Sequence, residues 1–254
     1  MRHAAHQRTA ERFAVFFNEK INGKEKSGHI KTKGKERRAM RKRKIIAVLA
    51  IGAIMAGMLT ACASNESSLS GSRTTLSGIP IVGKSTDIQK CVTIAPYDIP
   101  DTITYKEGTK EEALNEARTE IWDQIKNNAT FNGIPADMYE EFEKEYEENC
   151  LYISGSESLS QYLDYAGITK EDHEKAKAQY AEANCEQELV LLVVADSLGI
   201  NEESPEYEEA YTAFIDSTGL TEKEAEGELI KRTVLYKSVL GKLTEGCTVT
   251  KEVS

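Results

Sequence analysis

Apolar residues beyond position 109 recur at intervals of three and four, the spacing that gathers side chains on one face of an α-helix. Two segments begin with capping-box spacing, Thr109 to Glu112 and Thr221 to Glu224. Others begin at a proline or end at a glycine, as helices commonly do. The pattern predicts about six helices, which start near Thr109, Pro135, Ser158, Thr169, Ser204 and Thr221.

Strand patterns are scarce. "KCVTIAPYDIP", residues 90–100, mixes β-branched residues with two prolines and predicts one short strand or extended segment. The terminal "CTVTKEVS" predicts a second short strand, paired with the segment near Cys91. We therefore expect an all-α fold with at most one or two short strands. Trp122 lies on an apolar helix face, which predicts a place in the core, and only the apolar end of the long fourth helix is expected to enter that core.

The most apolar run of the chain lies earlier and has a different character. Residues 41–44 are all Lys or Arg, and the next 17 residues, Ile45 to Ala61, carry no charge. This order is typical of a secretory signal, and a retained transmembrane helix of minimal length is the alternative. Both interpretations place the cations inside and the chain from residue 63 outside the membrane.

The end of that run has a recognisable motif. Leu59-Thr60-Ala61-Cys62 resembles the lipobox of bacterial lipoproteins. The resemblance implies cleavage between Ala61 and Cys62 and a diacylglycerol-linked Cys62 as the first residue of the mature chain. The protein would then be lipid-anchored at the extracytoplasmic face of the cell membrane. A buried thiol within a membrane helix is the alternative interpretation of Cys62.

These features divide the chain into four parts. Residues 1–39 form a basic extension, either a mis-assigned start before Met40 or a cytoplasmic tail, and 40–61 form the lipoprotein signal peptide. Residues 62–88 are rich in Ser, Gly and Thr and predict a flexible tether, and 89–254 form the helical domain.

Residues 1–61 hold 15 Lys and Arg against four Asp and Glu, whereas the remainder holds 17 against 38. So acidic a mature part argues against a nucleic-acid partner.

Catalytic motifs are missing from the sequence. It has no Gly-rich phosphate loop, H-E-x-x-H, C-x-x-C or G-x-S-x-G motif, so we expect no enzyme activity, no cofactor, no metal and no small-molecule substrate. His173 is the only histidine after residue 61 and is interpreted as a surface residue. The acidic stretch "EEFEKEYEEN" is interpreted as a solvated helix face and not as a metal site.

Four further cysteines remain after Cys62. Export would allow disulfides among them, in any of three pairings, and free buried thiols are the equal alternative. These residues are Cys91, Cys150, Cys185 and Cys247.

The helical part resembles a known family. The segments "GIPADMYEEFEKEYEEN", "SLSQYLDYAGITKEDHEKAKAQYAEANCEQELVLLVVADSLGI" and "TGLTEKEAEGELIKRTVLYKSVLGKLTE" are similar in order and apolar pattern to the C-terminal chaperone domain of bacterial trigger factor, a fold shared with SurA. The resemblance covers roughly residues 130–245. It implies helical arms around an open cradle that binds unfolded or newly secreted polypeptides without ATP.

The resemblance also has limits. The FKBP-like prolyl isomerase domain of that family has no room here, because only about 30 residues separate "VTIAPYDIP" from "GIPADM". A non-chaperone adaptor or surface-assembly subunit is the second hypothesis, and a prolyl isomerase-related protein is the third. Exposed aromatic side chains are the candidate client-binding residues, with a core position as the alternative for each. The candidates are Tyr162, Tyr165, Tyr180, Tyr207, Tyr211 and Phe214.

Overall fold

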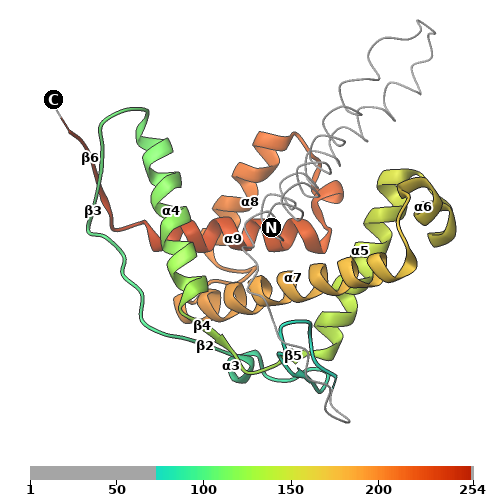
Figure 1. Cartoon of the computed structure of the whole chain (residues 1–254). Helices are drawn as coiled ribbons and strands as arrows, with labels where there is room; N and C mark the ends of the chain where they lie inside the picture. The colour runs from blue at the N-terminus through green and yellow to red at the C-terminus, as the bar shows by residue number, and fades with distance from the viewer. Residues whose placement is uncertain (1–72, 253–254) are drawn as a thin grey trace, which may run out of the picture. The chain divides into compact units, whose positions relative to one another are not determined.

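The computed structural model describes residues 73–252, which are predominantly helical (Figure 1). Seven α-helices occur in this part of the chain, and six of them are the expected ones. The helices are α3 (Ile88–Cys91), α4 (Lys110–Asn127), α5 (Ala136–Ser154), α6 (Leu159–Ala166), α7 (Lys170–Leu198), α8 (Pro205–Thr218) and α9 (Glu228–Leu243). The four-residue α3 was not expected.

Local chemistry explains most of the helix ends. At the start of α4, the Glu112 amide donates to the Thr109 hydroxyl at 3.2 Å, and the Glu112 carboxylate accepts from the Thr109 amide at 2.7 Å. This reciprocal capping box satisfies two amides that have no partner within the helix. Gly199 ends α7 with a φ of 68°, a left-handed conformation that favours glycine.

The last predicted helix is interrupted. Thr221 does form a capping box with Glu224, but it opens a short 3₁₀ helix, η2 (Glu222–Ala225), and α9 starts only at Glu228. Gly227 lies between them in an extended conformation. Glycine is a poor helix former, so the chain turns there and the prediction of one continuous helix from Thr221 is wrong.

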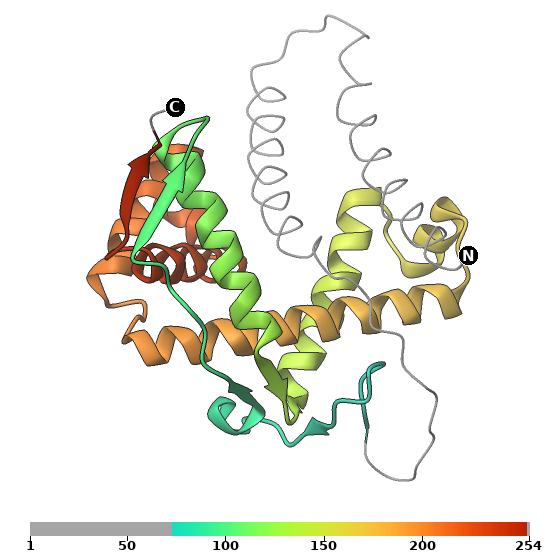
Figure 2. The same cartoon turned by 60° about the vertical axis from the view of Figure 1, so that its left-hand side comes forward.

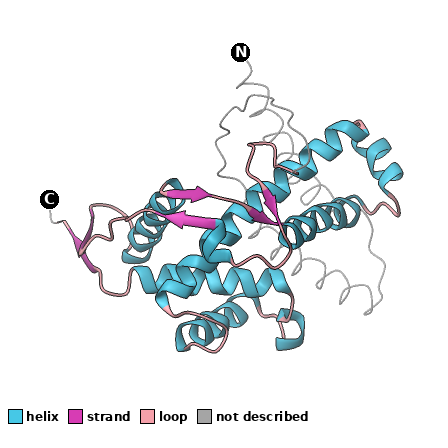
Figure 3. Cartoon of the chain, turned by 90° about the horizontal axis from the view of Figure 1, so that it is seen from below, coloured by secondary structure: helices cyan, strands magenta, loops and turns pink. Residues whose placement is uncertain are grey.

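The described residues contain more strand than predicted, as six short strands in three two-stranded pairs (Figure 3). Of these, β2 is the strand expected within residues 90–100. The pairs are β1 (Ile81–Val82) with β5 (Ile134–Pro135), β2 (Val92–Ile94) with β4 (Ala129–Phe131), and β3 (Thr102–Tyr105) with β6 (Thr248–Lys251). The coarse prediction of a mostly helical fold is confirmed, and the limit of one or two strands is wrong.

The partner of the C-terminal strand also differs from the prediction. β6 runs parallel to β3, with Ile103 opposite Val249, and does not pair near Cys91 (Figure 2). Ala113 and Ala117 of α4 pack on this pair together with Ile103. Their small side chains allow the helix to lie close to the two strands, which form a small core of their own.

The main core surrounds α7, which packs against α5, α9 and α4. Leu189, Val190 and Val194 of its apolar end are buried, as expected. The polar first half of α7 was not expected to reach the core, but it packs along α5 and also contributes buried residues. Trp122 of α4 is buried and meets Tyr236 of α9 edge to face at 5.0 Å, which confirms its predicted core position.

The domain begins earlier than expected. Residues 73–88 were predicted to belong to a flexible tether, but Thr74 forms a β-bridge with Pro80, and β1 pairs with β5. The Thr75 side chain is buried and bonded to Glu182 of α7. The boundary predicted at 88/89 is therefore corrected to residue 73 or earlier.

The predictions for residues 1–72 lie outside the described residues. They include the basic extension, the signal peptide, the Ala61–Cys62 cleavage site and the lipidation of Cys62. Among residues 73–252, no helix is both long enough and apolar enough to cross a bilayer.

Candidate functional site

The six candidate aromatic side chains do not form one exposed surface. Tyr162, Tyr207 and Phe214 are buried, and Tyr180 and Tyr211 are half-buried. Tyr207 and Phe214 belong to the core between α8 and α9, where they pack with Ile230 and Val234 of α9. Only Tyr165, on α6, is exposed. Tyr162, Tyr207 and Phe214 thus follow the core alternative, and Tyr165 alone among the six candidates is exposed.

Two exposed apolar residues that sequence reasoning missed lie close to Tyr165 in the chain. Tyr152 and Ile153, in the last turn of α5, are 47% and 46% exposed, and Tyr165 is 48% exposed. We call these three residues the α5–α6 tip, since α6 follows α5 directly and packs against it (Figure 1). The signal in the sequence was "CLYI", an apolar run at the end of an otherwise acidic helix.

Beneath the tip lies a buried histidine. His173, in the first turns of α7, has no exposed surface, so the interpretation of it as a surface residue is wrong. Tyr146 of α5 and Tyr162 of α6 cover its ring at centroid distances of 5.3 and 5.6 Å. These aromatic rings come from two other helices, which is why the local sequence around His173 gives no sign of its burial.

The environment of the His173 ring disfavours its protonated form. Burial lowers its pKa, and this effect outweighs the opposite influence of the nearby Glu174 and Glu147 carboxylates. Within residues 73–252, neither ring nitrogen has a hydrogen-bond partner. Such an unsatisfied buried polar group is unusual in a folded protein, because its loss of hydration is not compensated.

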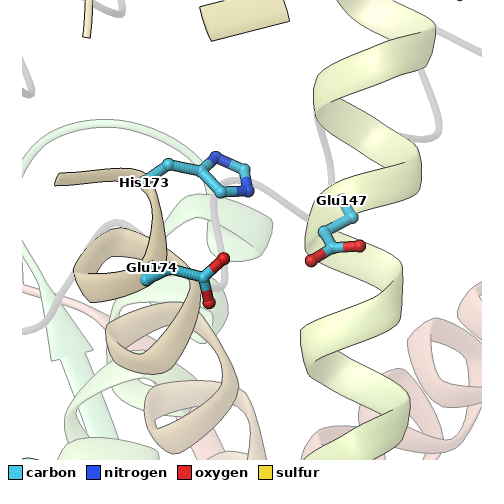
Figure 4. Close-up of side chains that lie close together, drawn as sticks. All are labelled: Glu147, His173 and Glu174. Atoms are coloured by element: carbon cyan, nitrogen blue, oxygen red, sulfur yellow. The ribbon is translucent and has the colours of Figure 1, made fainter. Parts of the chain in front are cut away.

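The carboxylates of Glu147 and Glu174 lie beside the histidine (Figure 4), and Lys177 contacts both of them. Lys177 of α7 donates to Glu147 of α5 at 2.8 Å and contacts Glu174 of α7 at 2.7 Å. Burial lowers the pKa of Lys177, but its hydrogen bonds to the two carboxylates outweigh this and raise the pKa overall. The hydrogen bond from Lys177 in turn lowers the pKa of Glu174. Ligand atoms of Glu147, His173 and Glu174 all lie within 4.8 Å of one another.

The base of α5 is held by a second ionic cluster. Arg232 of α9 donates to Glu145 at 3.0 Å and to Glu141, and it lies 3.6 Å from Glu188 of α7. Its guanidinium also lies 4.6 Å from the centre of the Phe142 ring. One cation thus joins three helices, which fixes the direction in which α5 carries the tip.

The cysteines of the described part are all free thiols. Burial is the main cause that raises the pKa of Cys91, Cys150 and Cys185, so each stays protonated. The half-buried Cys247 donates from its sulfur to the Pro100 carbonyl at 3.0 Å. Of the two alternatives left open by the sequence, these residues follow the free-thiol one, and the three buried thiols are poorly suited to act as nucleophiles.

Known proteins offer no comparison for these features: no protein-family model, curated protein or solved structure matches the chain. The geometry alone therefore defines two candidate sites. One is the apolar α5–α6 tip, which can bind apolar segments. The other is the Glu147, His173 and Glu174 group beneath it, which can bind a cation.

Proposed function

We propose that this protein binds unfolded or newly secreted polypeptides outside the membrane, without ATP and without an enzymatic step. Lipid on Cys62 would hold it at the extracytoplasmic face of the membrane. The observation that carries the proposal is the concentration of exposed apolar side chains on α5 and α6. Three of the five large apolar residues that are exposed in the described part form the α5–α6 tip: Tyr152, Ile153 and Tyr165.

Exposed apolar side chains that gather on one part of a surface commonly mark a site of interaction. Residues 62–254 carry 38 acidic against 17 basic residues. The resulting negative charge makes copies of the protein repel one another, which opposes self-association through the exposed tip. The partner best suited to this surface is an unfolded segment with apolar and basic residues, since it would contact the tip and the acidic face of α5 together.

The support of the tip agrees with this role. The Arg232 cluster fixes the base of α5, while Tyr146, Tyr162 and His173 pack between α5, α6 and α7. A firmly held apolar surface loses little conformational freedom on binding. Cys62 lies 11 positions before Arg73, and a chain of that length can span at most about 40 Å. The tip would therefore stay near the membrane where exported chains emerge.

Aggregation of a reduced, secreted client protein tests the proposal. The protein at equimolar amounts is expected to slow the rise in light scattering of the client, with no nucleotide present. No effect at several-fold molar excess would favour the second hypothesis, a non-chaperone adaptor or assembly subunit. Prolyl isomerisation of a short peptide, measured in parallel, would support the third hypothesis if it were accelerated.

A further inference from the structure

His173 and the two carboxylates beside it combine three features of a binding site for a cation. They come from two different helices, Glu147 from α5 and His173 with Glu174 from α7, and their ligand atoms lie within 4.8 Å of one another. His173 is fully buried, and its two ring nitrogens have no hydrogen-bond partner in the part of the chain that the structure describes. In Figure 4 its ring extends toward the helix of Glu147, and the two carboxylates face each other.

We propose that Glu147, His173 and Glu174 bind a divalent transition-metal cation, for which Zn²⁺ is the best match. One imidazole nitrogen with two carboxylate oxygens is a donor set that zinc accepts, whereas Ca²⁺ and Mg²⁺ prefer oxygen ligands alone. Tetrahedral bonds of roughly 2.0–2.2 Å place ligand atoms about 3.3–3.6 Å apart. Small side-chain rotations can close the present spacing to that value.

The surroundings suit such an ion. The side chains of Glu147 and Glu174 are 42% and 44% exposed, so a cation can enter from solvent and keep a water as a further ligand. His173 lies on the buried side, where the tyrosine rings fix its position. Coordination would give a ring nitrogen the partner that it lacks.

Lys177 is the competitor for this site. Its ammonium contacts the Glu147 and Glu174 oxygens at 2.8 and 2.7 Å, the same groups that would coordinate the metal. A lysine stem is flexible, so the ammonium can move aside into solvent. The metal affinity therefore includes the free energy of displacing one positive charge, and removal of Lys177 is expected to increase it.

Metal binding would link α5 to α7 directly beneath α6. The ion would then reduce the motion of the α5–α6 tip relative to α7. This role is distinct from the binding of polypeptides. Zn²⁺ binding can therefore be tested whether or not the protein binds unfolded polypeptides.

Calorimetric titration of the metal-free full-length chain in detergent with ZnCl₂ tests the site, with Co²⁺ absorption as a second readout. His173→Gln and Glu147→Gln are each expected to weaken Zn²⁺ binding at this site at least tenfold. Lys177→Met is expected to tighten it about tenfold. Glu148→Gln is the matched control: Glu148 is an exposed neighbour that pairs with Lys144, and its substitution is expected to leave Zn²⁺ binding unchanged.

Thermal unfolding tests the site without substituting any of the three residues that would coordinate the metal. Without metal, Lys177→Met is expected to have a lower Tm than the unmodified protein, because two carboxylates lose their cation. Adding Zn²⁺ is expected to raise the Tm of Lys177→Met by more than it raises the Tm of the unmodified protein. Zn²⁺ binding of equal strength in the His173→Gln and unmodified proteins would overturn the proposal. So would a lack of binding at millimolar Zn²⁺ in both the unmodified protein and Lys177→Met, which would leave Lys177 as a simple ion-pair partner.

Discussion

The carboxylate of Glu182 accepts a 2.7 Å hydrogen bond from the hydroxyl of Thr75, a residue 107 positions earlier in the chain. It also accepts from the amides of Leu76 and Ser77, both at 3.1 Å, and from the Ser77 hydroxyl. One buried acidic side chain of α7 thereby closes the turn at 75–77 onto the helical domain. These hydrogen bonds, together with the pairing of β1 with β5, attach the first described residues to the domain.

Glu182→Gln is expected to destabilise the protein by about 2–3 kcal/mol, because charge-assisted hydrogen bonds are the strong ones and an amide nitrogen would face backbone donors. Urea unfolding measures the change in the free energy of unfolding. In Glu182→Gln, the amide hydrogen exchange of residues 75–80 is expected to accelerate relative to the unmodified protein, and by more than the exchange of α7. Equal exchange in both proteins would show that Glu182 does not hold this turn.

Glu186, one helical turn further along α7, gives the opposite prediction. Burial, and then the charge of Glu182, raises the pKa of Glu186 to about 7. The folded state therefore binds a proton between about pH 4.5 and 7 that the unfolded state has released, so this group lowers stability as the pH rises through that range. We expect Glu186→Gln to stabilise the protein by about 1–2 kcal/mol at pH 8, after allowance for partial exposure, and to have little effect at pH 4.5.

Urea unfolding at both pH values measures the difference. The pair of variants makes a matched control, since Glu182→Gln and Glu186→Gln remove the same charge from the same helix with opposite expected signs. A loss of stability in Glu186→Gln at pH 8 would contradict the raised pKa of Glu186.

Gly133 precedes β5 where the chain passes very close to β1. A Cβ atom at Gly133 would lie 2.6 Å from a Val82 methyl and 3.4 Å from the Pro80 carbonyl. Gly133→Ala is therefore expected to destabilise the protein by about 1–3 kcal/mol through overpacking. Adding Val82→Ala removes the methyl and is expected to recover part of that loss, which a double-mutant cycle of chemical unfolding measures. Additive effects of the two substitutions would contradict this account.

Arg232 holds three carboxylates that belong to two other helices. Arg232→Gln leaves Glu141, Glu145 and Glu188 without this cation and is expected to cost about 2–3 kcal/mol, less than for a fully buried ion pair because Glu141 is exposed. The exposed pair of Lys144 and Glu148 provides the control, and Lys144→Gln is expected to change the free energy of unfolding by less than about 0.5 kcal/mol. Similar costs for the two substitutions would show that the Arg232 cluster does not join α5, α7 and α9.

The sequence predicted the helices well because their signals are local. Thr109 with Glu112, and the glycines after the helices, lie within a few residues of the ends that they determine. The strand pairs could not be predicted in the same way. β3 and β6 lie almost 150 residues apart, and a four-residue strand has too little pattern to identify its partner.

The corrections at the candidate sites have the same cause. Thr75 lies in a segment with the composition of a linker, and its order depends on Glu182, far along the chain. His173 is buried by Tyr146 and Tyr162, which come from two other helices. The sequence left both a binding role and a core position open for Tyr207 and Phe214, and the packing of α8 on α9 places them in the core.

The binding of an unfolded client by variants of the α5–α6 tip tests the central claim most directly. Tyr152→Ser with Ile153→Ser removes two exposed apolar side chains, and Ile99→Ser removes one of similar exposure from the segment between β2 and β3. We expect the affinity for a fluorescently labelled, reduced client to fall at least fivefold in the tip variant and to stay unchanged in Ile99→Ser, with the Tm of each protein preserved. Equal affinity of the tip variant and the unmodified protein would contradict the account.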